Sequence, residues 1–514
     1  MQQFTALVHW PSAPLTESLV RKSLASLEAR PHIEASLSDD QLSSTQNLLQ
    51  WSTYDSIDHD LTYSATSDTK RLSSCYTIRK ALIRKHFLSR CIQNYITKRG
   101  DSLLKVAVPR TWDIELSFAD ELDEMWSDDL YDLGQELDLE DVNKWWMLKP
   151  GMADRGMGIR LFHTKDDLTK IFEDFEQNES DEETEEFEQN GSDDKTEDAA
   201  HEESATAVVT SQLRHFVIQE YLSAPLLLDP SEAPLDGSVR PPLPDLHGHK
   251  FHLRVYCVAS GALQVYMYTR ILALFSAVPY KPPGAASEGT SNLDINENLA
   301  AHLTNTSLQT ERGEAGVRLF DELIGCHILS GEKPSSTHIE QSQARSQRPP
   351  HSMGMAMDAT RIRAAKKELA ATAENAQRPA LTNEDVQDIQ SQIANVLTET
   401  FKAALDMSVH FQPLPNAFEL YGVDFLVTHN VSSPISRKFQ VHLLEVNSEP
   451  AIELTGPRLT WILEDLFRAI GKVCVTPFFT SSDQRDNQTK WEVGEMREAL
   501  RKCLDVEVRG AKGW

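Results

Sequence analysis

The stretch FQVHLLEVNSEPAIEL, residues 439–454, places a carboxylate and an amide in an otherwise apolar run. Glu445 and Asn447 are two residues apart, so in a β-strand their side chains point to the same face, whereas residues 441–444 have the composition of a core. A buried carboxylate needs a partner, and a divalent cation would satisfy both groups. The alternative is a strand that runs out into a surface loop, and this stretch by itself favours neither interpretation.

Length and composition bound the class of protein. The chain has 514 residues and a mass of 57.9 kDa, which is room for roughly three domains or one large catalytic unit with insertions. It contains no long uncharged apolar run, and its first residues, MQQFTALVHWPSAP, lack the features of a signal peptide. Its six cysteines include no CxxC pair, which argues against a disulfide framework or a zinc knuckle. We therefore expect a cytoplasmic protein with reduced thiols and no membrane association.

The net charge of −28 is concentrated in one segment. Residues 173–203 carry about half of it and contain a duplication, FEQNESDEETEE followed by FEQNGSDDKTED, with almost nothing apolar to bury. Such a composition predicts a disordered acidic insert at 173–204. The rest of the chain is only moderately acidic, so the charge of the whole chain does not identify a partner. We expect no nucleic-acid partner.

Apolar periodicity divides the chain into four expected parts. Residues 1–74 begin with a strand, FTALVHW, and an amphipathic helix, LTESLVRKSLASLEA, which predict an αβ region. Residues 75–210 contain the acidic insert between two short strands, NKWWMLKP and HFVIQEYL. Residues 211–480 form the next part, with a loop insert at 329–352. We expect 481–514 to be a C-terminal tail or helix.

The third part alternates strands with a long helix. KFHLRVYCVASGALQVYMYTRIL predicts a hairpin that turns at Ser260 and Gly261. A helix with a buried apolar stripe follows, capped by Asn383, and then the strands ELYGVDFLVTH and FQVHLLEVN. This alternation indicates one elaborate α/β or α+β enzyme.

Polar residues interrupt these strands in a pattern that suits phosphoryl chemistry. Such chemistry needs cations and a metal around developing negative charge. LKPGMADRGMGIRLF places Lys149 at a strand end, before a glycine-containing turn whose amides could approach phosphates. A tight hairpin is the alternative interpretation of that turn by itself. The other members of the pattern are Lys250, Arg254, Arg270, Asp424, Glu445 and Asn447.

Eight stretches together resemble the tubulin-tyrosine ligase family, whose catalytic domain has the ATP-grasp fold. They are TIRKALIRKHFL, VPRTW, WWMLKPGMADRGMGI, FVIQEYLSAPLL, KFHLRVY, HLTNTSLQ, LYGVDFLV and LLEVNSEPA, in the family's order over residues 75–455. HLTN and the late D…ExN set are the most specific. The resemblance implies an α/β (α+β) ATP-grasp catalytic domain, with 75–210 as its central and 211–480 as its C-terminal subdomain.

The resemblance also implies roles for particular residues, with ATP and Mg²⁺ as cofactors. Arg254 and Arg270 would be catalytic, meeting the γ-phosphate and the substrate carboxylate, and Asp424, Glu445 and Asn447 would hold Mg²⁺. The metal would then be the partner that the polar end of 439–454 requires. The implied ATP contacts are Lys149, Arg155, Gly156, Gly158, Lys250, His252 and Asn305, with the strand Gln219, Glu220, Tyr221 and Leu222 offering backbone to adenine.

The implied function is ATP-dependent ligation through an acyl phosphate. The family joins an amino acid, here with tyrosine favoured, to the C-terminal glutamate of a protein with an acidic tail such as α-tubulin. A tubulin glutamate or glycine ligase is an alternative. A second alternative is a catalytically impaired ATP-grasp binding protein, because His252 stands where the family usually has the aspartate of KFDxR.

An acidic tail requires a local cationic surface on an otherwise acidic protein. The densest candidate is the helix predicted after Cys75, with an apolar stripe from residue 78 to 95 and Lys80 and Arg84 one turn apart on another face. The alternative is an ordinary solvated basic face. The residues that we expect to bind the tail are Arg79, Lys80, Arg84 and Lys85.

Overall fold

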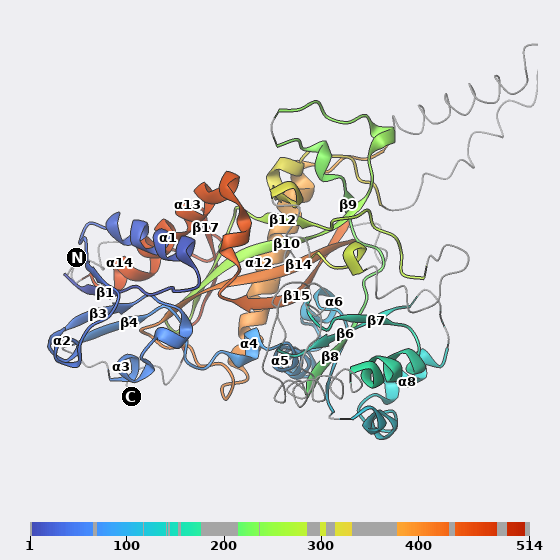
Figure 1. Ribbon diagram of the computed structural model, residues 1–514, viewed down its shortest axis with the longest axis horizontal. Coiled ribbons are helices and arrows are strands. Elements are labelled where there is room, and N and C mark those ends of the chain that lie inside the picture. The colour runs from blue at the N-terminus through green and yellow to red at the C-terminus, as the bar shows by residue number, and fades with distance from the viewer. Residues whose placement is uncertain are drawn as a thin grey trace, which may run out of the picture.

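The computed structural model describes residues 3–64, 69–116, 118–139, 141, 144–152, 156–175, 214–235, 237–284, 299–304, 314–330, 378–430, 437–480 and 491–508. Strands of these residues form a parallel N-terminal sheet, an antiparallel central sheet and a large sheet whose strand pairs are all antiparallel (Figure 1). Arg155, Asn305, the acidic insert from residue 176 and the loop insert from residue 331 lie outside the described residues.

The N-terminal sheet has the strand order β2-β1-β3-β4, and all of its neighbouring strands are parallel. The expected strand and helix at the start of the chain are both present, so the αβ character of this region is confirmed. Residues 31–74, which show no clean period, supply the other strands. The elements are β1 (Thr5–Leu7), α1 (Pro14–Ala25), β2 (His32–Glu34), α2 (Asp39–Ser44), β3 (Asn47–Gln50), α3 (His59–Tyr63) and β4 (Lys70–Ser73).

The central sheet is antiparallel with the order β5-β8-β6-β7. Trp146, Leu148 and Phe216 on one face belong to a core that also includes residues of the short helices, and the other face is left for the site described below. The two strands predicted on either side of the acidic insert, β6 and β8, are direct neighbours. The elements are β5 (Thr111–Glu115), α7 (Leu122–Met125), α8 (Tyr131–Leu137), β6 (Trp146–Pro150), β7 (Arg160–Phe162) and β8 (His215–Glu220).

The large sheet is organised around β10 (His249–Ser260), which pairs with β11, β12 and β14 along its length. Phe251, Leu253 and Val255 pack in one core with α12 (Asn383–Leu405), while Tyr256 belongs to a second core shared with the N-terminal sheet and α13 (Thr460–Ile470). The predicted hairpin is β10–β11. The other strands are β9 (Leu227–Leu228), β11 (Gln264–Tyr268), β12 (Leu272–Phe275), β13 (Val317–Leu319), β14 (Phe418–His429), β15 (Phe439–Ser448), β16 (Met496–Arg497) and β17 (Leu500–Asp505).

Two local expectations are corrected in this region. The part of 481–514 that the structure describes contains β16 and β17, and β17 extends the large sheet beside β11, so a tail or helix is wrong there. Leu500, Cys503 and Leu504 are buried against that sheet, which explains why this segment forms a strand. The cap of α12 is Thr382, whose Oγ1 accepts from the Asp385 N–H at 3.1 Å, and Asn383 is the first helical residue.

The basic segment after Cys75 is not one helix. It forms α4 (Lys80–Ile83) and α5 (Lys85–Lys98), followed by α6 (Leu104–Ala107). Arg84 separates α4 from α5 in an extended conformation, with φ −107° and ψ 120°. Lys80 and Arg84 therefore do not share a helical face. In the described part of the chain, no helix is long and apolar enough to span a membrane.

Candidate active site

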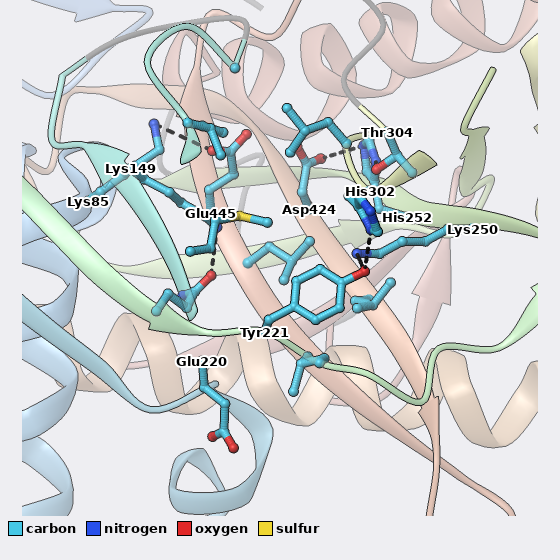
Figure 2. Close-up of a pocket in the computed structure, with 18 of the residues that line it drawn as sticks. Lys85, Lys149, Glu220, Tyr221, Lys250, His252, His302, Thr304, Asp424 and Glu445 are labelled. Atoms are coloured by element: carbon cyan, nitrogen blue, oxygen red, sulfur yellow. Dashed lines mark hydrogen bonds and ion pairs between the residues drawn. The ribbon is translucent and has the colours of Figure 1, made fainter. Parts of the chain in front are cut away.

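A cavity lies between the central sheet and the large sheet. It holds about 950 Å³ of empty space, its open mouth included, which is the size of a small-molecule site. Figure 2 shows cationic side chains and carboxylates turned toward this space. The residues that line it are Lys85, Met147, Lys149, Pro150, Gly156, Met157, Ile159, Gln219, Glu220, Tyr221, Leu222, Lys250, His252, His302, Leu303, Thr304, Asp424, Leu426, Leu444, Glu445 and Asn447.

The alternation of side chains along β10 places Lys250 and His252 in the lining of the cavity, whereas Arg254 is not part of the lining and contacts it through Asp424. Lys250, His252 and Arg254 are two residues apart and share one face, whereas Leu253 and Val255 point into the core with α12. On the neighbouring strand β14, Asp424 lies directly opposite Arg254. Two hydrogen bonds join this pair, one of them from Nη2 to Oδ2 at 2.9 Å.

A β-bulge brings Glu445 to the same face. Asp424 pairs with Glu445 and Phe425 pairs with Leu443, so Leu444 is an extra residue in β15. Before the bulge, Val441 and Leu443 point into the core, and without the extra residue Glu445 would do the same. Bulges commonly re-aim side chains beside active sites. The bulge at Leu444 is what turns Glu445 and Asn447 toward Asp424.

Asp424, Glu445 and Asn447 converge on one point. Asn447 Nδ2 lies 3.2 Å from Glu445 Oε1 and 3.4 Å from Asp424 Oδ2. With its amide rotated, Asn447 would present oxygen to the same place, and two carboxylates with an amide are the hard oxygen donors that Mg²⁺ prefers. The donor chemistry therefore fits the implied metal. Among the described residues, no group of three or more His, Cys, Asp and Glu side chains forms a metal cluster, so the amide is needed.

Two buried lysines face these acids across the cavity. Lys149 donates to Gln219 Oε1 at 2.6 Å, and burial lowers its pKa to about 8 despite the nearby Glu445. Burial and the charge of Lys149 lower the pKa of Lys250 to about 7. The Lys250 ammonium lies 3.4 Å from the Tyr221 hydroxyl and 4.4 Å from the centre of that ring. Both lysines would gain from a polyanionic ligand.

Lys85 completes the positive side of the cavity. Its Nζ lies 3.5 Å from Glu445 Oε2. Burial by itself would raise the pKa of Glu445, but Lys85 and Lys149 outweigh that effect and lower the pKa to about 2. Glu445 is therefore ionised at any physiological pH, as a metal ligand must be.

In the stretch at residues 219–222, which we expect to bind adenine, only part of the backbone is free of hydrogen bonds to other segments. The Glu220 N–H donates to Arg110 O at 2.8 Å and the Tyr221 N–H to Trp145 O at 2.9 Å. The Glu220 side chain points away from the other labelled residues in Figure 2, and its carboxylate bonds to Arg110 at 3.1 Å. The strand β8 ends at Glu220, so Leu222, which follows it, is the residue of the expected stretch whose N–H could meet a base.

His252 is neutral, and one of its two ring nitrogens makes no hydrogen bond to the described residues. Burial lowers its pKa, and its Nδ1 lies 2.5 Å from Thr304 Oγ1. Its Nε2 lies 3.6 Å from Asp424 Oδ1 and has no hydrogen-bond partner in the described part of the chain. The neighbouring His302 lies 2.9 Å from the Tyr221 hydroxyl, and burial lowers its pKa to about 4. The HLTN stretch therefore supplies two polar groups to the cavity.

Several predicted residues are placed elsewhere. Arg270 pairs with Asp465 at 3.0 Å and stacks on Trp461, and it is not part of the cavity lining. Arg79 is buried in an ion pair with Glu419, so it is a structural group and not a surface one. Lys80 is exposed, while Arg84 lines a smaller cavity that shares Lys85 and Glu445 with the main one.

Sequence reasoning missed the apolar part of the lining. Met147, Ile159, Leu426 and Leu444 face the space between the two sheets. Met147 could have been found, because it is two residues before Lys149 on the same strand. Gly156 and Gly158 have φ values of 80° and 69°, a backbone region that favours glycine, which explains the glycines of the predicted turn.

Comparisons with known proteins show the family. A model of the tubulin-tyrosine ligase family matches residues 71–327 and 358–484. The chain belongs to the tubulin-tyrosine ligase family.

Relatives are found in yeasts. Probable tubulin–tyrosine ligase PBY1 of Saccharomyces cerevisiae is 34% identical over 421 residues, which are 81% of this chain and 44% of that protein. The chain thus spans less than half the length of that relative. Probable tubulin–tyrosine ligase C12B10.04 of Schizosaccharomyces pombe is 33% identical over 448 residues, 86% of each chain.

A solved structure supports the fold. The crystal structure of the C-terminal domain of K. lactis Pby1, described as an ATP-grasp enzyme interacting with the mRNA decapping enzyme Dcp2, is 28% identical to this chain. The two structures superpose with a TM-score of 0.56, over 98% of this chain and 100% of that domain. The mixed α/β architecture is therefore that of an ATP-grasp protein, as the sequence motifs predict.

Proposed function

We propose that the protein is an ATP- and Mg²⁺-dependent ligase that joins an amino acid, with tyrosine favoured, to the C-terminal glutamate of an acidic protein tail such as that of α-tubulin. One observation carries the proposal. Lysines from both sheets and the oxygen donors Asp424, Glu445 and Asn447 surround one cavity, as the transfer of a phosphoryl group from ATP requires.

The lining suits each part of ATP. Met147, Ile159 and Leu426 offer apolar contacts to the base beside the Leu222 backbone. Lys149 lies near Glu445 and Lys250 lies beside Tyr221, and both would bind phosphate oxygens. Asp424, Glu445 and Asn447 would hold Mg²⁺, which neutralises charge that develops on the phosphates.

Ligation then needs positioning more than covalent chemistry by the protein. An acceptor carboxylate oxygen attacks the γ-phosphorus, and the bond from that phosphorus to the β–γ bridging oxygen breaks. The products of this step are ADP and an acyl phosphate. The incoming amine attacks the acyl carbon, phosphate leaves and the amine loses a proton, so that an amide remains. Arg254, held by two hydrogen bonds to Asp424, is the cation placed to orient the acceptor carboxylate.

The test uses the purified chain with ATP, Mg²⁺ and a peptide that ends in glutamate, offered with labelled tyrosine, glutamate or glycine. We expect one tyrosine added for each ADP formed, and no product from the Lys149→Ala variant. Glutamate or glycine in the product would identify the alternative ligases. ATP binding without any ligation or ADP would contradict the proposal.

His252 supports a second candidate, a nucleotide-binding protein without turnover. Its neutral ring stands where the family usually has an aspartate, so one negative charge near the phosphates is missing. Replacing His252 by Asp distinguishes the two candidates. If the wild-type chain has no turnover and the Asp variant gains it, the result would support the binding protein as the function of this chain. If the wild-type chain, with His252 in place, is active, the result would support the ligase.

The relative from K. lactis points to a further candidate partner. Because that protein interacts with Dcp2, a decapping enzyme is a candidate partner for this chain as well. A binding assay between purified proteins, with and without ATP, tests this partner independently of ligation.

A further inference from the structure

The loop that follows the metal-site residues is held by the N-terminal region. Glu449 lies two residues after Asn447, and its carboxylate accepts from Thr53 Oγ1 at 3.1 Å and from the Tyr54 N–H at 2.8 Å. Four residues further on, Glu453 accepts from the Thr16 N–H at 3.2 Å and from Thr16 Oγ1 at 2.9 Å. Two carboxylates of one short segment thus bond to α1 and to the turn after β3, both in the N-terminal region.

The backbone of this loop needs such support. Glu449 has a φ of 51°, a region that residues with a Cβ adopt at a cost in free energy and retain only when surrounding contacts impose it. On the opposite side, Pro450 packs so closely on Gly422 that a Cβ added there would lie 2.6 Å from the Pro450 Cβ. Gly422 itself is opposite Asn447 in the sheet.

Apolar packing also joins these two parts, because Ile452 belongs to the core that includes Trp51. Next to Glu449 and Pro450, however, a cavity lies between the parts, and Trp10, Trp51 and Ile452 are among its other lining residues. Across that cavity, the hydrogen bonds of Glu449 and Glu453 are direct polar links between the two parts. Tyr54 is held in turn by Arg79, whose guanidinium lies 4.0 Å from the centre of its ring.

We propose that Glu449 is a positioning residue, through which the turn after β3 holds Glu445 and Asn447 in the arrangement that binds the metal. The inference rests on the proposed function, because it concerns the same metal site. Glu449 acts through the hydrogen bonds to Thr53 and Tyr54, not as a ligand itself. The N-terminal region then has a role in catalysis although the residues it contributes do not line the main cavity.

The variants separate this role from others. Glu449→Gly removes the carboxylate and also tolerates the positive φ, and Thr53→Val removes one donor while leaving Glu449 in place. Glu449→Gln keeps an acceptor oxygen without the charge. The control is Glu464→Gln, which removes the charge from the exposed contact of 2.7 Å between Lys22 of α1 and Glu464 of α13, another link to the N-terminal region.

The first measurement is the Mg²⁺ concentration needed for half-maximal ATP binding by the full chain. Loss of a group that orients metal ligands typically weakens metal affinity by about tenfold or more, and we expect such a shift for Glu449→Gly and a smaller one for Thr53→Val. ADP binding without metal should not change. Glu449→Gln should keep most of the wild-type affinity, and Glu464→Gln all of it. A wild-type Mg²⁺ requirement in Glu449→Gly, or an equal loss in Glu449→Gln or Glu464→Gln, would overturn the proposal.

The second measurement is amide hydrogen exchange of the protein without ligands. Exchange at residues 446–455 should become faster in Glu449→Gly and Thr53→Val than in Glu464→Gln, while β10 stays protected. Unchanged exchange in this segment would overturn the proposal. This readout does not depend on the metal, so a wild-type protein that binds no Mg·ATP would refute the proposed function and still leave exchange to decide the role of Glu449.

Discussion

Two ion pairs join the basic segment at residues 79–85 to the large sheet. They differ in the exposure of their side chains and in the number of hydrogen bonds that each carboxylate accepts from the protein. The side chains of Arg79 and Glu419 are 9% and 3% exposed, and Glu419 also accepts from the Tyr421 hydroxyl at 2.7 Å and the Tyr76 N–H at 3.1 Å. The side chains of Lys85 and Glu445 are 20% and 23% exposed and face the cavity.

The comparison shows that like charges in one segment can have opposite roles. The oxygens of Glu419 are saturated by the protein, so that pair can only stabilise the fold. Lys85 touches Glu445 at 3.5 Å on one side and leaves the other side of the carboxylate to a ligand. Four predictions test this division, in order of decreasing effect.

Replacing Arg79 by Met should cost the most. It leaves the Glu419 carboxylate buried without its cation, and breaking a buried pair in this way typically costs about 3–5 kcal/mol of folding free energy. Urea unfolding of the variant should show that loss. Lys85→Met is the matched control and should unfold close to the wild-type midpoint. Equal stability of the two variants would remove the distinction between the pairs.

Replacing Glu445 by Gln should act on ligand binding and not on folding. Loss of one charged oxygen donor from a set of two carboxylates and an amide should weaken Mg·ATP binding by more than tenfold, or about 1.4 kcal/mol. Calorimetric titration measures the affinity, and thermal unfolding checks the fold. Glu419→Gln should show the reverse pattern, with lower stability and unchanged Mg·ATP affinity in the protein that remains folded.

The buried lysines predict a pH dependence. The pKa values of Lys149 and Lys250 are about 8 and about 7 in the folded protein without ligand, so both ammonium groups lose their protons as the pH rises from about 6.5 to 9. Phosphates favour the protonated form, and ATP affinity should therefore fall over this range, with proton uptake on binding. Glu445, with a pKa of about 2, stays ionised throughout. Lys250→Met should flatten the profile, and a flat wild-type profile would contradict the assignment.

The exposed end of the basic segment should have the smallest effect. Reversing Lys80 and Arg84 to Glu should weaken binding of a glutamate-rich peptide, because each exposed ion pair contributes only about 0.2–1 kcal/mol. The loss should shrink between about 50 and 300 mM salt, since added ions screen such contacts. Lys80 is exposed and Arg84 is half-buried, and reversing the exposed Lys98 and Lys105 is the control of equal charge. An equal loss in the control would make the attraction non-specific.

Much of the site could be predicted because strands impose a period of two. Lys250 and Arg254 share a face by spacing alone, and the family motifs add the opposing strands. The same reasoning failed for Arg79, because a cluster of cations in the sequence does not reveal which of them meets a buried carboxylate 340 residues away. It also failed for β17 in the last described segment, because this strand forms by pairing with the edge of β11, which is distant in the sequence.

The sequence by itself determined the αβ character of the chain and the β10–β11 hairpin, and it predicted the oxygen donors and lysines that line the cavity, because these depend on local periodicity and on motifs of fixed spacing. Only the tertiary structure decided how the donors meet. One extra residue in β15, Leu444, turns Glu445 toward Asp424. A bulge depends on how its strand pairs with the neighbouring strand and not on the composition of its own strand. The support of Glu449 by Thr53 likewise joins residues 396 positions apart, and contacts at that separation form only when the sheets pack.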